Sequence, residues 1–213
     1  MAEKNLHFKD RIDAGKKLAE AVLKYKGIKN VVVYALPRGG VVIGKEVAER
    51  LGCPLDTLII KKIGHPSFEE YAIGAVSENG NAIFNETELQ NIDKKWLENE
   101  VEKKKAEAKL RRELYSKNSQ PISSKGKIAI IVDDGIATGL TMSAAIKEIK
   151  SNKPKKIIVA IPVAPKEIVD PIKKEVDGFI SLSVPEMYLG AVGEYYDNFD
   201  QVSDQEVIKL LKP

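Results

Sequence analysis

The sequence has little of the chemistry that metal sites and covalent catalysis need. Its 213 residues include one cysteine, Cys53, and two histidines, His7 and His65. A lone cysteine cannot form an internal disulfide, which is typical of a reducing compartment, so we expect a cytoplasmic protein. Two separated histidines do not make the His/Cys cluster that binds zinc. No Ser/His/Asp or Cys/His constellation for a covalent nucleophile is evident.

Long apolar runs and a strong charge of one sign are also missing. No stretch approaches the roughly 20 apolar residues of a membrane-spanning helix, and the N-terminus lacks the apolar segment of a secretory signal. The 34 basic and 31 acidic side chains leave a net charge of +3. Because this bias is weak, we expect neither nucleic acid nor a membrane as a partner. The length suits one α/β domain with its own core.

What the sequence does contain is a series of short, β-branched apolar runs. Continuous runs of this kind predict strands that are buried on both faces of a parallel sheet. The runs fall at 30–36, 54–63, 127–132 and 156–164, with a weaker one at 178–184. Helical patterns lie at about 10–26, 40–50, 141–150 and 165–174. Alternating strands and helices predict an α/β fold with a doubly wound, mostly parallel sheet.

A segment over about 71–116 interrupts this alternation and is predicted to be an insertion. Asn79 and Gly80 lie between alternating apolar residues, which is the strongest short-range signal for a β-hairpin. A long helix is expected to follow from about residue 86, with Asn85 as its N-cap and Glu88 completing a capping box. Its narrow apolar stripe is expected to pack on the rest of the chain, although a partner subunit is the alternative.

The most informative stretch is Ile128–Thr141, which reads I-A-I-I-V-D-D-G-I-A-T-G-L-T. An apolar strand ends there at two aspartates, and ligands of open α/β sheets bind at the carboxyl ends of strands. Glycines let backbone amides crowd around an anion, threonine hydroxyls donate, and the following helix start adds its positive dipole end. A phosphate site is therefore predicted around Gly135, Thr138, Gly139 and Thr141.

The two aspartates, Asp133 and Asp134, would repel a phosphate and therefore need another partner. A ribose 2′,3′-diol presents two hydroxyl donors side by side, and Mg²⁺ bound through the substrate would relieve the negative charge. A helix cap is the simpler explanation of Asp-Asp-Gly, but it accounts for only one aspartate and one glycine. The stretch is neither a P-loop, since no Gly-Lys-Ser/Thr follows, nor a G-x-G-x-x-G dinucleotide signature.

With these residues the sequence resembles the type I phosphoribosyltransferases. Their defining stretch is an apolar run, two acidic residues, glycine, a small apolar pair, threonine, glycine and a hydroxyl residue, and Ile128–Thr141 matches it nearly position for position. The resemblance implies that Asp133 and Asp134 bind the ribose hydroxyls of phosphoribosyl pyrophosphate. It also implies that the residues that surround the 5-phosphate are Gly135, Ile136, Ala137, Thr138, Gly139, Leu140 and Thr141. It extends to a stand-alone group of predicted phosphoribosyltransferases through the segments 8–19, 70–76 and 192–207.

The resemblance also assigns pyrophosphate to the loop A-L-P-R-G-G, residues 35–40. In the family this loop binds through a strained peptide beside a basic residue, and the guanidinium fork of Arg38 suits phosphate oxygens. A plain strand-to-helix turn is the alternative. A mobile loop is expected over about 61–70, where Glu70 would orient the loop or a base, although His65 and Glu69 suit a solvated loop equally. The predicted pyrophosphate-binding residues are Pro37, Arg38, Gly39, Gly40, Lys61 and Lys62.

Residues of about 184–200, with part of the N-terminus, occupy the place where these enzymes form a small hood over the acceptor. Tyr188, Val192 and Tyr195 are the predicted acceptor-binding residues, although clustered aromatic side chains are also typical of a core or an interface. The whole chain, 1–213, is expected to form one phosphoribosyltransferase domain. A homodimer is a further expectation, because oligomers are common in the family.

The predicted reaction displaces pyrophosphate from C1 of the activated ribose by a nitrogen acceptor, of which a nucleobase is the expected one. Positioning and electrostatics would carry catalysis, with Mg²⁺ as the cofactor. The predicted catalytic residues are Asp133, Asp134, Arg38 and Lys62. Two alternatives stay open: a regulator that senses phosphoribosyl pyrophosphate or a nucleotide without turnover, and a phosphoribosyl hydrolase on the same scaffold.

Overall fold

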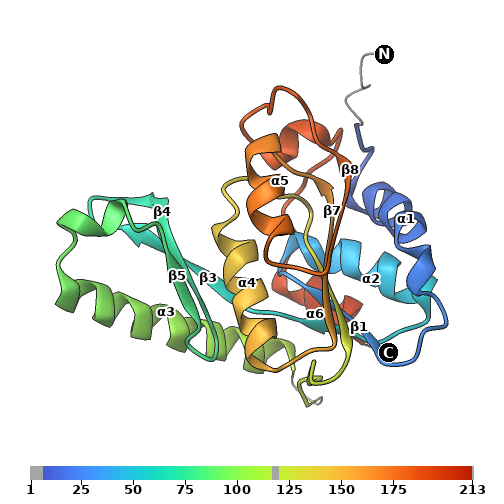
Figure 1. Ribbon diagram of the computed structural model, residues 1–213, viewed down its shortest axis with the longest axis horizontal. Helices are drawn as coiled ribbons and strands as arrows, with labels where there is room; N and C mark the ends of the chain where they lie inside the picture. The colour runs from blue at the N-terminus through green and yellow to red at the C-terminus, as the bar shows by residue number, and fades with distance from the viewer. Residues whose placement is uncertain (1–6, 117–119, 213) are drawn as a thin grey trace.

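A computed structural model describes residues 7–116 and 120–212 of the chain. Its body is a parallel five-stranded sheet in the order β2-β1-β6-β7-β8, with helices on both faces (Figure 1). The strands are β1 (Val31–Ala35), β2 (Leu55–Thr57), β6 (Ile128–Val132), β7 (Lys156–Val163) and β8 (Gly178–Ser183). The helices of the body are α1 (Arg11–Ala21), α2 (Gly39–Leu51), α4 (Leu140–Ser151), α5 (Lys166–Lys173) and α6 (Asp204–Leu210).

Each face of the sheet has its own core, because successive side chains of a strand point to opposite sides. Val31 and Val33 of β1 pack toward α1 and α2, whereas Val32 and Tyr34 pack toward α4 and α5. Every residue of β1 and of β6 is buried. The structure therefore confirms the doubly wound parallel sheet that the continuous apolar runs predicted.

The predicted second strand, 54–63, is in fact two strands that belong to different sheets. β2 pairs in parallel with β1, whereas β3 (Ile60–His65) pairs antiparallel with β4 (Phe68–Ser77). The chain changes partner at Leu58 and Ile59, which are both buried. A continuous apolar run does not reveal such a change, because both of its parts are covered by other residues.

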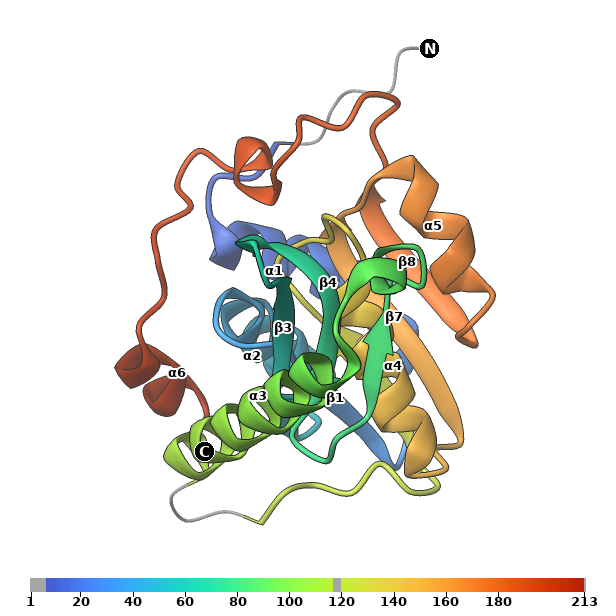
Figure 2. The same cartoon turned by 90° about the vertical axis from the view of Figure 1, so that its left-hand side faces the viewer.

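The insertion forms an arm that projects from the body (Figures 1 and 2). The arm consists of the antiparallel strands β3, β4 and β5 (Ala82–Phe84) and the helix α3 (Lys94–Tyr115). The predicted hairpin at Asn79 and Gly80 is confirmed, since β4 pairs with β5 and Gly80 has a φ of +89°. The mobile loop expected over 61–70 is instead the hairpin of β3 and β4.

The long helix α3 begins at Lys94 rather than near residue 86. Its N-cap is Asp93, whose carboxylate accepts the backbone N–H of Trp96 at 2.8 Å. Asn85 instead accepts the Thr87 hydroxyl at 2.7 Å in an earlier turn. Although α3 has 22 residues, it is highly charged, and no helix among the described residues is both long and apolar enough to cross a membrane.

The apolar stripe of α3 packs on the small sheet, as expected for an element that docks on its own chain. Trp96, Leu97 and Val101 contact the buried Ile63 and Ile73. The C-terminal half departs from the predicted stripe, because Leu110 is 66% exposed. In this half of the helix Arg112 makes the contact. Its guanidinium donates to Asp56 at 2.7 Å and to Glu78 at 3.0 Å, and the bond to Asp56 joins α3 to β2.

A buried carboxylate of α4 fastens the arm to the body. Glu148 is 2% exposed and accepts hydrogen bonds from the side-chain amides of Asn79 and Asn81, each at 2.7 Å. The hydroxyl of Ser77 donates to the same carboxylate. Burial of a carboxylate is unfavourable unless donors surround it. The three donors of the β4–β5 hairpin therefore fix the hairpin, and β3 beside it, against α4.

We predict that Glu148→Ala lowers the free energy of unfolding by about 3 kcal/mol, because the buried donors of the hairpin lose their acceptor. Urea denaturation would measure the change. Lys150→Ala on the same helix is the control, since Lys150 is exposed and pairs only with Glu175 at the surface; its effect should stay below about 1 kcal/mol. Equal effects of the two substitutions would contradict this role of Glu148.

Candidate functional site

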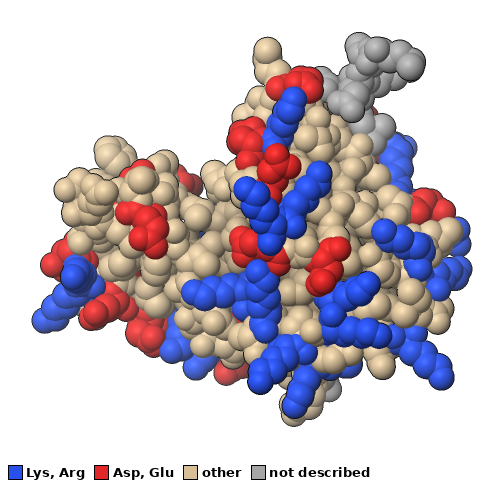
Figure 3. Space-filling model, viewed as in Figure 1, with Lys and Arg blue, Asp and Glu red and all other residues tan. Residues whose placement is uncertain are grey.

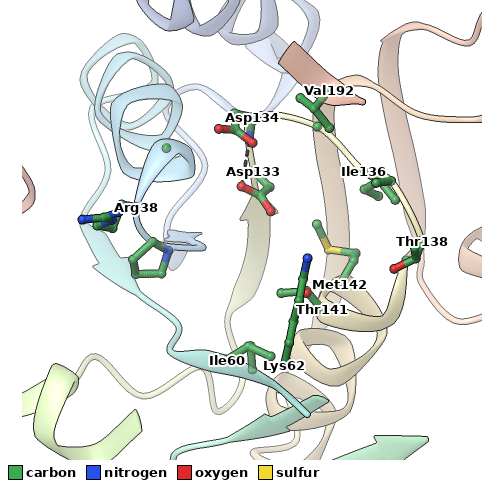
Figure 4. A pocket seen from close by; sticks show the side chains of 15 residues that line it. Arg38, Ile60, Lys62, Asp133, Asp134, Ile136, Thr138, Thr141, Met142 and Val192 are labelled. Atoms are coloured by element: carbon green, nitrogen blue, oxygen red, sulfur yellow. Dashed lines mark hydrogen bonds between the residues drawn. The ribbon is translucent and has the colours of Figure 1, made fainter. Parts of the chain in front are cut away.

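The carboxyl ends of β1 and β6 meet at one edge of the sheet and border a cavity of about 300 Å³ (Figure 4). Loops that follow adjacent parallel strands come together there because the strands run in the same direction. The cavity is lined by Pro37, Arg38, Gly39, Ile60, Lys62, Asp133, Asp134, Gly135, Ile136, Ala137, Thr138, Gly139, Thr141, Met142 and Val192. The body thus supplies most of the lining, and the arm supplies two residues from β3.

The loop after β6 has the geometry of an anion site. Of the predicted phosphate-binding residues, all except Leu140 line the cavity. Gly139 is the N-cap of α4, with a φ of +81° that favours glycine, and no side chain caps the helix start. The first N–H groups of α4 therefore have no side-chain acceptor, and Thr138 and Thr141 lie beside them (Figure 4). An anion would supply the missing acceptor.

The acid pair, Asp133 and Asp134, lies between this loop and the loop after β1. Asp133 accepts the backbone N–H of Asp134 at 2.8 Å through its Oδ1 atom. Burial raises the pKa of Asp133 well above its ordinary value, and the neighbouring charge of Asp134 raises it further. The Lys62 ammonium points into the cavity near Asp133 (Figure 4) and acts in the opposite direction on that pKa. Donors and cations brought by a ligand would likewise favour the ionised carboxylate.

Asp134 is held by Arg11, a residue that was not among the predicted site residues. The Nε atom of Arg11 donates to Oδ2 of Asp134 at 2.8 Å, and Nη1 donates to the backbone oxygen of Asp200 at 2.7 Å. The guanidinium carbon lies 3.7 Å from the centroid of the Phe199 ring. Burial raises the pKa of Asp134, and the Arg11 guanidinium opposes that rise. No local pattern reveals this pair, since its members are 123 positions apart.

The glycines of the loop after β1 are required by close packing on the acid pair. A Cβ atom on Gly39 would lie 1.9 Å from Oδ2 of Asp134 and 2.6 Å from Nε of Arg11. A Cβ atom on Gly40 would lie 2.8 Å from Oδ1 of Asp133, and Gly40 itself does not line the cavity. The peptide bond before Arg38 is cis. These glycines thus have a role in packing that their prediction as pyrophosphate ligands did not include.

The two lysines predicted to meet pyrophosphate lie on opposite faces of β3. Lys62 lines the cavity, whereas Lys61 pairs with Glu107 of α3 at 3.3 Å. Successive side chains of a strand point to opposite sides, so only one of two adjacent lysines can face the site. The Lys61 side chain therefore contacts α3 within the arm and does not line the cavity. Both lysines were predicted at the end of a strand, and the alternation of side chains along that strand was not applied to them.

The C-terminal segment 184–200 packs with the N-terminus beside the acid pair. Phe8 donates its backbone N–H to the oxygen of Tyr195 at 2.9 Å and accepts the N–H of Asp197 at 2.8 Å. The hydroxyl of Tyr196 donates to the backbone oxygen of Asp134 at 2.6 Å. The segment predicted as a hood is thus tied to the loop after β6.

The predicted acceptor-binding residues divide between the cavity and the core. Val192 lines the cavity and approaches Gly135 so closely that a Cβ atom there would lie 2.6 Å from its Cγ1 atom. Tyr195 is 1% exposed, and the Tyr188 ring stacks on it at 5.5 Å between centroids. Neither tyrosine lines the cavity. The aromatic cluster packs as a core, which was the alternative explanation of this pattern.

We predict that Arg11→Met lowers the free energy of unfolding by about 3 kcal/mol at pH 7, because the buried Asp134 carboxylate loses its partner. The pKa of Asp134 is raised, so its ionised form destabilises the folded state above that pKa, and acidification relieves the penalty. The loss should therefore be smaller at about pH 4 than at pH 7, as measured by urea unfolding at both values.

Arg50→Met provides the matched control, since Arg50 makes a similar pair with Glu20 at 2.6 Å on the exposed surface. Because solvent screens this exposed pair, its effect should be much smaller than that of Arg11→Met at either pH. A loss for Arg11→Met that does not change with pH would show that packing on Phe199, and not the ion pair, accounts for the effect.

The comparisons with known proteins identify the family of the chain. A family model described as a phosphoribosyl transferase domain matches residues 4–198. A Mycobacterium tuberculosis protein named "Putative phosphoribosyl transferase", found in strains CDC 1551 and H37Rv, is 38% identical over 206 residues, which are 96% of this chain and 46% of that protein. The chain thus spans about half the length of these curated relatives.

Solved structures agree in fold. The crystal structure of a Thermus thermophilus protein, 39% identical, superposes with a TM-score of 0.81 over 96% of this chain and 97% of that one. An Aquifex aeolicus protein of 16% identity shares the fold alone, with a TM-score of 0.50 over 83% and 74% of the two chains. Because the family model covers most of the chain, this chain belongs to the phosphoribosyl transferase family.

Proposed function

We propose that the protein transfers the 5-phosphoribosyl group of phosphoribosyl pyrophosphate to a nitrogen acceptor of the nucleobase type and releases pyrophosphate. The observation that carries the proposal is the meeting of three features in one cavity: the uncapped start of α4, the acid pair and the Arg38 loop. Each suits one part of the donor. The helix start suits the 5-phosphate, and the acid pair suits the ribose hydroxyls. Arg38 and Lys62 suit the pyrophosphate.

The two aspartates of the acid pair have different roles in this proposal. Asp134 is occupied by Arg11 and packed against Gly39, so its carboxylate is fixed. Asp133 makes no such ion pair among the described residues, and the Lys62 ammonium lies near it (Figure 4). Ribose hydroxyls that donate to Asp133 would stabilise its ionised form, and Asp133 is thus the main ribose ligand that we propose.

In the reaction, the bond between C1 and the pyrophosphate oxygen breaks, and the leaving pyrophosphate takes the electron pair. The nitrogen acceptor forms the new bond to C1 with its lone pair, and its N–H proton leaves with the released pyrophosphate. Arg38 and Lys62 stabilise the charge that develops on the leaving group, and the helix start keeps the 5-phosphate in place. Val192 closes the cavity at Gly135 and limits the access of water to the activated ribose.

We propose Mg²⁺ as the cofactor, shared between substrate and protein. Among the described residues, no group of three or more His, Cys, Asp or Glu side chains is placed to hold a metal alone. The oxygen donors of Asp133 and Asp134 nevertheless fit Mg²⁺, which commonly binds one or two carboxylates together with substrate phosphates. When bound, the ion would neutralise phosphate charge and so ease departure of pyrophosphate.

Pyrophosphate release from phosphoribosyl pyrophosphate, assayed with and without purine, pyrimidine and other nitrogen acceptors, distinguishes the transferase from its alternatives. Release that requires an acceptor supports transfer. Release that is independent of every acceptor indicates a hydrolase, and donor binding without release indicates a sensor. The acid pair together with the Arg38 loop favours turnover, since a sensor of a 5-phosphate needs neither.

We predict that Asp133→Asn together with Asp134→Asn weakens donor binding and lowers turnover by about 100-fold or more, because each amide replaces one acceptor oxygen by an NH₂ donor and removes the charge that favours hydroxyl donors and Mg²⁺. Steady-state kinetics and calorimetric titration with phosphoribosyl pyrophosphate would measure both. Asp133→Asn alone keeps the Arg11 pair and controls for folding. Asp170→Asn on α5, at an exposed position, should leave the kinetics unchanged. Full activity of the double variant would refute the assignment.

Arg38→Ala should weaken pyrophosphate binding by about 10-fold, the equivalent of roughly 1.4 kcal/mol, because a charge-assisted hydrogen bond is lost. Binding of ribose 5-phosphate should change less than about twofold, since that ligand lacks the group that Arg38 contacts. Competition titrations with the two ligands would measure both affinities. Equal losses for the two ligands would contradict the role of Arg38 at pyrophosphate.

A further inference from the structure

The edge of the sheet opposite the cavity is rich in lysine. Four segments lead into β1, β6, β7 and β8, namely 24–30, 125–127, 150–156 and 173–177, and we call them the basic edge. Their lysines are Lys24, Lys26, Lys29, Lys125, Lys127, Lys150, Lys153, Lys155, Lys156, Lys173 and Lys174. The acidic residues of the four segments are Glu175 and Asp177. With eleven lysines, the basic edge has a net charge of +9. The whole chain has a net charge of +3, so the residues outside the basic edge have a net charge of −6.

The four segments lie side by side because the strands that they enter are parallel neighbours. Backbone hydrogen bonds connect them directly: Ile128 donates to Asn30 at 2.9 Å, and Lys155 donates to Lys127 at 2.8 Å. All of the lysines are exposed except Lys127, which is partly exposed. Figure 3 shows basic side chains gathered over the lower part of the body, where these segments lie in Figure 1.

The lysines of the basic edge are mostly without acidic partners. Among them, only Lys150 makes an ion pair within the described part of the chain, with Glu175 at 3.3 Å. Helix dipoles explain some of the charges, since Lys150 and Lys173 lie in the last turns of α4 and α5. They do not explain the lysines that precede or begin strands, which are Lys125, Lys127, Lys155 and Lys156. Clustered like charges repel one another, so an anionic ligand would stabilise this arrangement.

We propose that the basic edge binds the phosphate backbone of a double-helical nucleic acid, without regard to base sequence. Adjacent strands lie about 4.8 Å apart, so the row from β1 to β8 spans roughly 14 Å. Each strand of duplex DNA carries one charge per about 3.4 Å of the axis, so about four phosphates of one strand fall within the length of this row. The lysines suit such an array as mobile point charges, and the four segments contain no arginine for bidentate contact with bases.

The residues between the lysines favour a duplex over a single strand or a membrane. Proteins that bind single strands use exposed aromatic rings as stacking platforms. The basic edge has one aromatic ring, Tyr25, which is half-buried and lies 5.3 Å from the Lys24 ammonium. Ile28 is the only large apolar side chain in these segments that is strongly exposed, at 45%. One isoleucine offers little area for insertion into a bilayer.

The weak net charge of the chain predicted that nucleic acid is not a partner, and the basic edge points the other way. A net charge is a sum over the chain, whereas binding depends on the local field. The basic edge lies at the amino ends of the strands, and the cavity lies at their carboxyl ends, so a bound duplex leaves the cavity open. The inference does not rest on the proposed enzymatic function.

The test is fluorescence anisotropy of a labelled DNA duplex of about 20 base pairs, titrated with the full chain between about 50 and 200 mM salt. We expect a Kd on the order of 10⁻⁵ M at low salt that rises steeply with salt. Lys153→Glu, Lys155→Glu and Lys156→Glu together should weaken binding at least about 10-fold. The slope of log K against log salt should also become shallower by about 3.

The matched control is Lys94→Glu, Lys95→Glu and Lys109→Glu on α3, which changes the net charge equally at exposed positions of the arm. This variant should bind the duplex within about twofold of the unaltered chain. If the glutamates of the first variant prevent folding, Lys153→Gln, Lys155→Gln and Lys156→Gln remove the same charges and should show the same ranking.

Three outcomes would overturn the proposal. One is the absence of binding by the unaltered chain at about 50 mM salt. Another is an equal loss in both triple variants, which would show that total charge and not the basic edge is responsible. The third is binding to phosphatidylserine vesicles without binding to the duplex, which would assign the surface to a membrane.

Discussion

The partial burial of two adjacent carboxylates at the end of β6 is the constraint around which this structure is organised. Carboxylates inside a protein destabilise it unless donors and cations surround them. Arg11 of α1 compensates Asp134, the glycines after β1 let that loop approach the pair, and Tyr196 reaches the same backbone from the C-terminal segment. Segments from both ends of the described chain therefore converge on one strand end, and the cavity forms beside it.

A parallel sheet gives the molecule two edges of different character. All carboxyl ends of the strands lie on one side, where the start of α4 and the acid pair form the cavity. All amino ends lie on the other side, where four lysine-bearing segments are brought together by strand pairing. The arm adds Lys62 to the first edge from a separate sheet, and Glu148 holds that sheet on α4. We thus propose anion binding at both edges, in the cavity at the carboxyl ends and on the lysines at the amino ends.

The sequence predicted the parts of the fold whose cause is local. Continuous β-branched runs indicate buried strands, and Asn79-Gly80 indicates a hairpin wherever it occurs, so both were confirmed. The start of α3 was misplaced, because Asn85 and Asp93 are equally good caps in sequence. The run 54–63 was assigned to one strand, because an apolar pattern reports burial and not the strand with which a segment pairs.

By itself, the sequence determined the family and the candidate site, because Ile128–Thr141 is a contiguous stretch whose glycines, hydroxyls and acids line one cavity. Only the tertiary structure decided what lies against that stretch. It brought Arg11 to Asp134 over 123 positions, turned Lys62 toward the cavity and Lys61 away from it, and buried Tyr195. The physical reason is that contacts between distant segments depend on strand order, strand direction and side-chain facing, none of which is written in the spacing of residues along the chain.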